Sequence, residues 1–228
     1  MTDLPDSFSP TFSDHGAQRF RGVAARDLDD LRAALASLPS DHAGVRIHGL
    51  PRLQPFLAQH GSIGAIAVGI LGTASRPVRA ILFDKSAQTN WSLAWHQDRT
   101  ICVKRRIDVA GFGPWTTKAG LHHVAPPFDI LRDMVTLRVH LDAVPATNAP
   151  LLIAPGSHRD GLVRVNAVAD VVRRRGSHAC LADAGDIWLY ATPILHASDA
   201  ATDPTHRRVL QLDFAAQDLP GGLEWLGV

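Results

Sequence analysis

The stretch from Gly185 to Ser198, GDIWLYATPILHAS, predicts two apolar strands separated by a short turn. The first strand covers 186–190 and the second covers 193–198. Because alternate residues of a strand point to the same side, His196 and Ser198 share one face of the second strand. A histidine on an apolar strand is more often a hydrogen-bonded core residue than a metal ligand. The stretch therefore predicts a β-rich core and leaves the role of His196 open.

Helices precede this region, and short strands surround it. Leucines at helical spacing predict a helix over 26–37, and two shorter helices are predicted over 53–57 and 63–71. From Val78 onwards, Gly, Pro, Asn and Asp separate short β-rich runs, which cover 78–83, 92–98, 100–107, 134–141, 150–154, 177–181, 186–190, 193–198 and 207–214. A strand over 44–48 and a helix over 167–174 complete the pattern. This order favours a mainly β fold, a sandwich or barrel with flanking helices.

The composition indicates one folded domain and excludes several classes of protein. No segment rich in Pro, Gly or Ser divides the 228 residues, so we expect a single domain over 1–228 with a mainly helical N-terminal part over about 1–77. The net charge of +1 is too small to attract nucleic acid or an acidic membrane surface. Two cysteines, Cys102 and Cys180, exclude a disulfide-stapled scaffold. Residues 1–13 lack a signal-peptide pattern and no apolar run is long enough to span a membrane, so we expect a cytoplasmic protein.

His96-Gln97-Asp98 follows the predicted strand that contains Trp95. Residues i and i+2 of a strand share a face, so an imidazole and a carboxylate are aimed at one point. With a second histidine they would form the two-His, one-carboxylate set that suits non-haem Fe(II). A chain with 12 His and 21 Asp contains about one His-x-Asp by chance, so the motif needs support from elsewhere.

That support comes from four motifs in order, which together resemble the phytanoyl-CoA dioxygenase family of Fe(II)/2-oxoglutarate-dependent oxygenases. The matching segments are Trp95-His96-Gln97-Asp98, the run from Asn148-Ala149-Pro150-Leu151 into Pro155-Gly156-Ser157-His158, the run from Ala184-Gly185-Asp186 to His196-Ala197-Ser198, and Arg207 eleven residues after His196. Ala149 stands where the family has a glycine. The resemblance covers about residues 78–216 and implies a double-stranded β-helix, the jelly-roll or cupin-like core, over that range.

The resemblance implies that His96, Asp98 and His196 bind Fe(II) and are the catalytic centre. It implies an enzyme that hydroxylates an unactivated C–H bond of a small molecule, with 2-oxoglutarate and O₂ as cosubstrates and succinate and CO₂ as products. Asp98 is intact, whereas halogenating relatives have Gly or Ala there, so hydroxylation is favoured. Two alternatives remain: a non-catalytic jelly-roll binding protein, and an iron enzyme of the same fold that does not use 2-oxoglutarate.

The resemblance also implies a cosubstrate site. Arg207 would pair with the distal carboxylate of 2-oxoglutarate, since its planar fork matches a carboxylate, and Ser198 would donate its hydroxyl to the same group. Lys85 and Arg138 are weaker cosubstrate candidates, and Arg138 falls where the family often has a tryptophan. Arg208 competes with Arg207, because periodicity alone does not choose between them.

Basic and aromatic residues near the site predict a small acidic substrate. Residues 108–128 lack periodicity, and a loop of that length with Trp and paired histidines is expected to be functional. The substrate candidates are Arg99, Trp115, Lys118, His123 and His140. A solvated basic edge strand is the simpler interpretation of the charges after Asp98. We expect a monomer or homodimer whose partners are small molecules alone.

Overall fold

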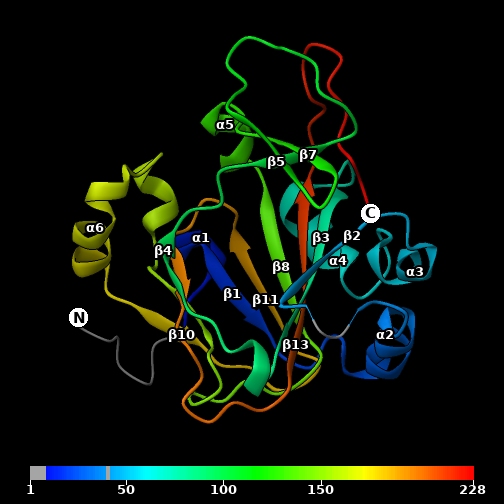
Figure 1. Ribbon diagram of the computed structural model, residues 1–228, viewed down its shortest axis with the longest axis vertical. Helices are drawn as coiled ribbons and strands as arrows, with labels where there is room; N and C mark the ends of the chain where they lie inside the picture. The colour runs from blue at the N-terminus through cyan, green and yellow to red at the C-terminus, as the bar shows by residue number, and fades with distance from the viewer. Residues whose placement is uncertain (1–8, 40–41) are drawn as a thin grey trace.

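The computed structural model describes residues 9–39 and 42–228, and the strands of this part form three antiparallel sheets (Figure 1). The six-stranded sheet has the order β1 (Ala17–Phe20), β11 (Ile187–Ala191), β8 (Val135–His140), β13 (Arg207–Ala215), β3 (Arg76–Lys85), β2 (Gly44–Ile47). The four-stranded sheet has the order β10 (His178–Cys180), β9 (Leu151–Ile153), β12 (His196–Ser198), β4 (Leu93–His96). The three-stranded sheet has the order β5 (Ile101–Val103), β7 (Leu121–Val124), β6 (Trp115–Lys118). The predicted mainly β fold is confirmed.

The helices are short and lie outside the sheets. They are α1 (Phe12–His15), α2 (Leu28–Leu35), α3 (Gln54–Leu57), α4 (Gly64–Leu71), α5 (Phe128–Arg132) and α6 (Val168–Arg175), with 3-10 turns at Ala25–Asp27, Pro51–Leu53, Ala87–Thr89, Ser157–Asp160 and Val165–Ala167. Each helix of the described residues is too short or too polar to cross a lipid bilayer. The helices predicted over 26–37, 53–57, 63–71 and 167–174 are confirmed with small changes of bounds.

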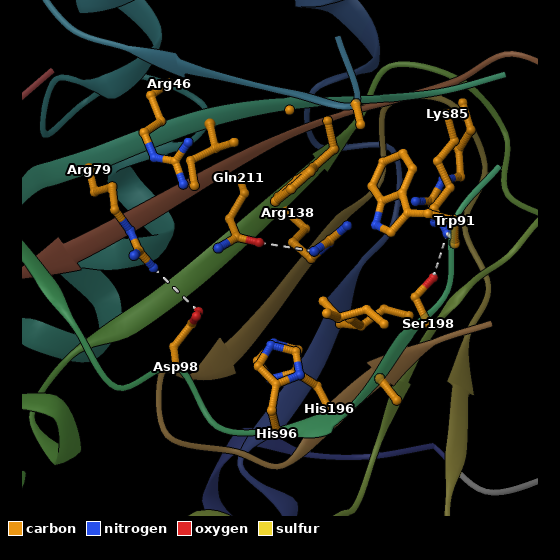
Figure 2. A pocket seen from close by; sticks show the side chains of 18 of the residues that line it. Arg46, Arg79, Lys85, Trp91, His96, Asp98, Arg138, His196, Ser198 and Gln211 are labelled. Carbon is orange, nitrogen blue, oxygen red and sulfur yellow. Dashed lines mark hydrogen bonds and ion pairs between the residues drawn. The ribbon is translucent and has the colours of Figure 1, made fainter. Parts of the chain in front are cut away.

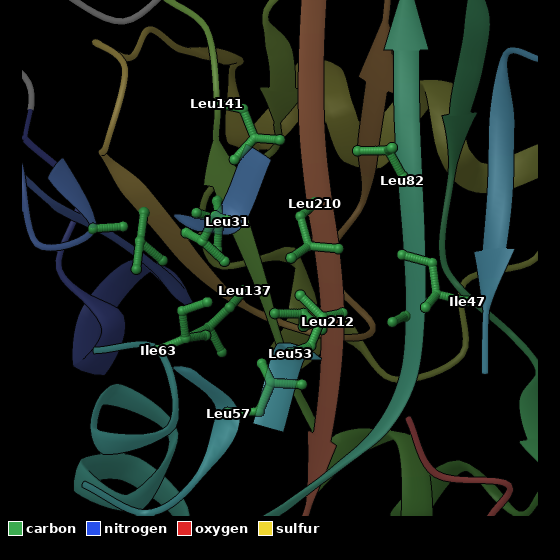
Figure 3. Close-up of a cluster of buried hydrophobic side chains, with 14 of the residues drawn as sticks. Leu31, Ile47, Leu53, Leu57, Ile63, Leu82, Leu137, Leu141, Leu210 and Leu212 are labelled. Carbon is green, nitrogen blue, oxygen red and sulfur yellow. The ribbon is translucent and has the colours of Figure 1, made fainter. Parts of the chain in front are cut away.

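The largest apolar cluster lies between the N-terminal helices and one face of the six-stranded sheet (Figure 3). Leu31 of α2 and Leu57 of α3 pack there against Leu137, Leu210 and Leu212 of β8 and β13. Burying a leucine side chain contributes about 1.5–3 kcal/mol, so this face fixes the register of the sheet. The opposite face of the same strands is thereby turned toward the four-stranded sheet.

Alternation along β13 and β3 decides which residues face inward. Leu210 and Leu212 face the helices, so Arg207, Gln211 and Asp213 face the other way. The register places these inward residues beside their counterparts on β3, with Arg207 opposite Lys85, Gln211 opposite Ile81 and Asp213 opposite Arg79. The interior between the two larger sheets is therefore lined by polar and charged side chains.

Two segments differ from the sequence-based prediction. The N-terminal part up to residue 77 contains a strand that was not predicted, because β1 pairs with β11 at one edge of the six-stranded sheet, whereas β2 at the other edge confirms the strand predicted over 44–48. Residues 108–128 are not one loop, since β6 and β7 form a hairpin there. Its turn, Ala119-Gly120, has φ of 50° and 76°, the positive values that a tight two-residue hairpin requires. Residues 1–8 of the polar N-terminal segment lie outside the described residues.

Candidate active site

A cavity of about 430 Å³ lies between the six-stranded and four-stranded sheets. Its walls come from β2, β3, β8 and β13 on one side and from β4, β9 and β12 on the other. The side chains that line it include His96, Asp98 and His196 together with six basic residues, Arg46, Arg79, Lys85, Lys118, Arg138 and Arg207. The cavity thus joins a cluster of potential metal ligands to a strongly basic surface (Figure 2).

His96, Asp98 and His196 meet at one end of this cavity (Figure 2). His96 ends β4 and is the direct cross-strand partner of His196, which begins β12. Their ring centroids lie 4.3 Å apart, and Asp98 follows β4 by two residues. One potential ligand atom from each of the three residues lies within 4.8 Å of the others. Antiparallel pairing therefore brings together ligands that are a hundred residues apart in the sequence.

The backbone fixes which imidazole nitrogens can bind a metal. Nδ1 of His96 lies 2.8 Å from the carbonyl oxygen of Ala94, and Nδ1 of His196 lies 3.0 Å from that of Ile194. A carbonyl oxygen only accepts, so each Nδ1 carries the proton and each Nε2 keeps a free lone pair. Burial lowers the pKa of His196 to about 4, so its ring is neutral at pH 7. Two imidazoles that each present Nε2 and one carboxylate fit a divalent iron ion.

Asp98 is held by Arg79, a residue that the sequence analysis missed. Asp98 Oδ2 accepts from Arg79 Nη2 at 3.3 Å, and Arg79 Nε donates to the buried Asp213 at 2.5 Å. Burial alone would raise the pKa of Asp98, but the positive charge of Arg79 lowers it overall. Arg79 lies six residues before Lys85 on β3, and their shared strand face is the signal that could have found it.

The cosubstrate candidates Lys85 and Ser198 lie together at another part of the wall (Figure 2), and Arg207 is the cross-strand partner of Lys85. Lys85 Nζ donates to Ser198 Oγ at 3.1 Å, and Arg207 Nη1 donates to the carbonyl of Ala149. Arg207 Nε is buried with no hydrogen-bond partner. No carboxylate of the described residues forms an ion pair with Arg207 or Lys85. The two side chains therefore place two positive charges in the cavity wall without an ion-pair partner among the described residues, a combination that suits an anion.

Electrostatics make this pair sensitive to an incoming anion. Burial, with the charges of Arg207 and Arg138 adding to it, lowers the pKa of Lys85 to about 8. Burial and Arg138 lower the pKa of Arg207 to about 9. Arg208 faces outward instead, where its Nη2 lies 2.8 Å from Asp142 Oδ1. The structure thus places Arg207 in the cavity and Arg208 outside it, a distinction that periodicity alone could not make.

Arg138 of β8 also lines the cavity, where its charge acts on both Arg207 and Lys85. Its Nη1 donates to Gln211 Oε1 at 2.9 Å, its guanidinium lies 5.3 Å above the ring of Phe83, and its Nε is buried without a partner. Gln211, Phe83 and Arg46 are further lining residues that the sequence analysis did not select. Only the long-range pairing of β2, β3, β8 and β13 brings them to one surface.

Lys118, near the tip of the β6–β7 hairpin, is the one substrate candidate of the five that lines the cavity. The expectation for the other four is corrected, because Arg99, Trp115, His123 and His140 do not line it.

Three of these four side chains make contacts elsewhere, whereas His140 is buried with no hydrogen-bond partner among the described residues at either ring nitrogen. Arg99 donates to the carbonyl oxygen of Val163, Trp115 packs in an apolar cluster beneath Arg106, and the His123 ring is buried beside the carbonyl of Leu121. His140 is buried on β8, and burial with the nearby arginines lowers its pKa to about 3.

Comparisons with known proteins agree with the fold and identify the family. Residues 22–209 match the family model described as phytanoyl-CoA dioxygenase (PhyH), whereas no curated protein sequence matches. EctD from S. alaskensis, in its apoform, has a TM-score of 0.65 at 18% identity, over 99% of this chain and 84% of that one. HygX from Streptomyces hygroscopicus, with nickel, 2-oxoglutarate and hygromycin B bound, has a TM-score of 0.61 at 15% identity, over 90% and 84%.

A third similar structure is SnoN, a non-heme alpha ketoglutarate dependent epimerase from nogalamycin biosynthesis, with a TM-score of 0.60 at 16% identity, over 92% of this chain and 87% of that one. At these identities the structural similarity establishes the fold, and it confirms the predicted double-stranded β-helix core. The family match covers most of the chain and confirms the resemblance drawn from its motifs, so the protein belongs to the phytanoyl-CoA dioxygenase (PhyH) family.

Proposed function

We propose that this protein is an Fe(II)- and 2-oxoglutarate-dependent oxygenase that hydroxylates a C–H bond of a small acidic metabolite. One observation carries the proposal: His96, Asp98 and His196 meet in the same cavity as two buried cations, Arg207 and Lys85, that have no acidic partner among the described residues. The first group fits a divalent metal, and the second fits a dianion that binds beside it.

Three side chains would hold the metal: His96 and His196 through Nε2, and Asp98 through a carboxylate oxygen. Bound iron supplies the oxygen activation that no amino-acid side chain performs, coupled to the conversion of 2-oxoglutarate to succinate and CO₂. The protein contributes the orientation of the groups that hold the metal. Arg79 keeps the Asp98 carboxylate fixed, and the carbonyls of Ala94 and Ile194 keep both imidazoles in one tautomer.

The cosubstrate would be oriented by its distal carboxylate. Arg207 pairs with that group, Lys85 adds a second positive charge, and Ser198 donates its hydroxyl once it releases the carbonyl of Ala149. HygX has been crystallised with 2-oxoglutarate bound and EctD with iron bound, which supports the same assignment here. A cytoplasmic location and a monomeric or homodimeric state stay predictions.

Succinate formation is the test of this function. Purified protein with Fe(II), O₂ and 2-oxoglutarate is expected to form succinate slowly, and faster with a small carboxylate- or phosphate-bearing substrate from a metabolite panel. His196→Ala should bind no metal and form none, whereas His60→Ala, an exposed histidine outside the cavity, should behave as wild type. Wild-type protein that forms no more succinate than His196→Ala would favour a non-catalytic binding protein.

Product analysis decides the type of oxidation. SnoN, a structural neighbour, is an epimerase, so this fold supports more than one outcome. We expect a product heavier than the substrate by one oxygen atom, with that atom derived from ¹⁸O₂. A product of unchanged mass with one inverted stereocentre would show that the reaction is an epimerisation and not a hydroxylation. The assignment of the metal and cosubstrate residues would then still stand.

A further inference from the structure

The cavity contains a second basic group that the cosubstrate site does not use. Arg46 lies on β2, and its side chain lines the cavity. Its Nε is buried with no hydrogen-bond partner, and no carboxylate of the described residues pairs with it. Arg79 is different, because Asp98 and Asp213 neutralise it. Arg46 is therefore a cation in the active-site cavity that has no carboxylate partner among the described residues.

The sheet register separates Arg46 from the cosubstrate site. Arg46 is opposite Ile81 on β3, whereas Arg207 is opposite Lys85 on the same strand. Ile81 and Lys85 are four positions apart, so the two sites are separated by about 13 Å along β3. Figure 2 shows the same separation, with Arg46 at one side of the pocket, Lys85 at the other and His96 and His196 below them. One carboxylate group cannot contact both ends.

Neighbouring side chains make this part of the wall suited to an anion. Val45 and Ile47 point away from the cavity, because Ile47 packs in the apolar cluster on the helix side. Lys118 approaches the same cavity from the β6–β7 hairpin. Among the described residues, Asp98 is the one carboxylate that lines the cavity, and it already forms an ion pair with Arg79.

We propose that Arg46, assisted by Lys118, is a second anion subsite that binds a carboxylate or phosphate group of the primary substrate. This inference rests on the proposed function and deepens it. The cosubstrate occupies the Arg207 end, so the substrate lies between the metal ligands and Arg46. A cavity of about 430 Å³ is at the small end of ligand pockets and holds both molecules only if the substrate is small. The substrate class is thus a small acid whose anionic group lies several bonds from the oxidised carbon.

Inorganic phosphate is the probe for this subsite. Protein loaded with Ni(II) and saturated with 2-oxoglutarate is titrated with phosphate by calorimetry, so that the cosubstrate blocks the first anion site. We expect weak phosphate binding to wild type and at least tenfold weaker binding to Arg46→Gln, since charge-assisted contacts dominate such a site. Arg46→Lys should retain most of the affinity, and Arg105→Gln, which removes an exposed arginine outside the cavity, should change nothing.

Two readouts keep this inference distinct from the proposed function. The affinity for 2-oxoglutarate is measured in the same variants, and Arg46→Gln should leave it within twofold of wild type. Normal 2-oxoglutarate binding with equal phosphate affinity in Arg46→Gln and wild type would overturn the subsite and leave the oxygenase assignment standing. Absence of 2-oxoglutarate binding in the wild-type protein would overturn both. Circular dichroism melting confirms that each variant is folded.

Discussion

At the scale of single residues, Arg79 links the proposed metal site to the core. It pairs with Asp98 and with Asp213, whose carboxylate is 2% exposed and also accepts from Thr136 at 3.0 Å. Arg79→Leu leaves the Asp213 carboxylate buried without its cation, so we expect the free energy of unfolding to fall by about 3–5 kcal/mol. Loss of support for Asp98 should also weaken Ni(II) binding by about 10–100-fold. Urea unfolding and metal titration measure the two effects.

The Arg79→Leu/Asp213→Leu double variant is the matched control. It removes both charges, so stability should largely return while metal affinity stays low. Stability equal to wild type in the single variant would show that the pair does not hold this region. Arg79 and Arg46, two arginines that line the cavity, do not belong to any of the sequence motifs. For that reason the sequence predicted the metal ligands and Arg207 but not the residues that support them.

Also at the residue scale, Lys85 gives the cosubstrate site a pH dependence. Its pKa is lowered to about 8, first by burial and then by Arg207 and Arg138. A bound dianion favours the charged amine, so binding raises this pKa and takes up a proton above about pH 8. The affinity for 2-oxoglutarate should therefore fall as pH rises from 7 to 9.5. Calorimetric titrations of the Ni(II)-loaded protein measure it, and Lys85→Met should bind more weakly at pH 7 with a flatter profile up to pH 8.5. A pH-independent affinity would contradict this.

At the scale of elements, β13 separates its two adjacent arginines onto opposite faces. Arg207 lies in the cavity, and Arg208 pairs with Asp142 outside it. Arg207→Ala should weaken 2-oxoglutarate binding by about 1.5–3 kcal/mol or more, the value of charge-assisted hydrogen bonds, and Arg208→Ala should change it little. Titration of both variants at one pH measures the difference. The reverse order would place Arg208 at the cosubstrate.

The packing and pairing of the elements also explain which parts of the fold could not be predicted from the sequence. Alternation within one strand defines two faces, but the face that becomes the interior depends on the helices that cover the other one, here through Leu210 and Leu212. The β6–β7 hairpin was missed because its turn begins with Ala119 rather than the Asn or Asp typical of such turns. Strand β1 was missed because Ala17–Phe20 is short and lacks a strong β pattern, and only its pairing with β11 defines it.

At the scale of the whole molecule, charge is nearly balanced but unevenly placed. The chain has a net charge of +1, yet the described residues that line its cavity include six basic side chains and a single carboxylate. Most acidic residues therefore lie elsewhere, many of them in ion pairs at the surface, such as Asp129 with Arg132 and Asp170 with Arg173. The overall charge, from which we expect no nucleic-acid partner, carries no information about this local excess of basic residues.

This placement predicts selectivity for charged substrates. A basic cavity with apolar walls concentrates field on an entering anion, so carboxylic acids should stimulate succinate formation more than their methyl esters or amides. For an active acid, kcat/KM should fall as ionic strength rises from about 0.02 to 0.5 M, because salt screens the cations that draw it in, while a neutral analogue should change little. The succinate assay with matched acid and ester pairs measures both effects. Equal stimulation by the two members of each pair, at every ionic strength, would mean that the cations of the cavity serve the cosubstrate alone and do not select the substrate.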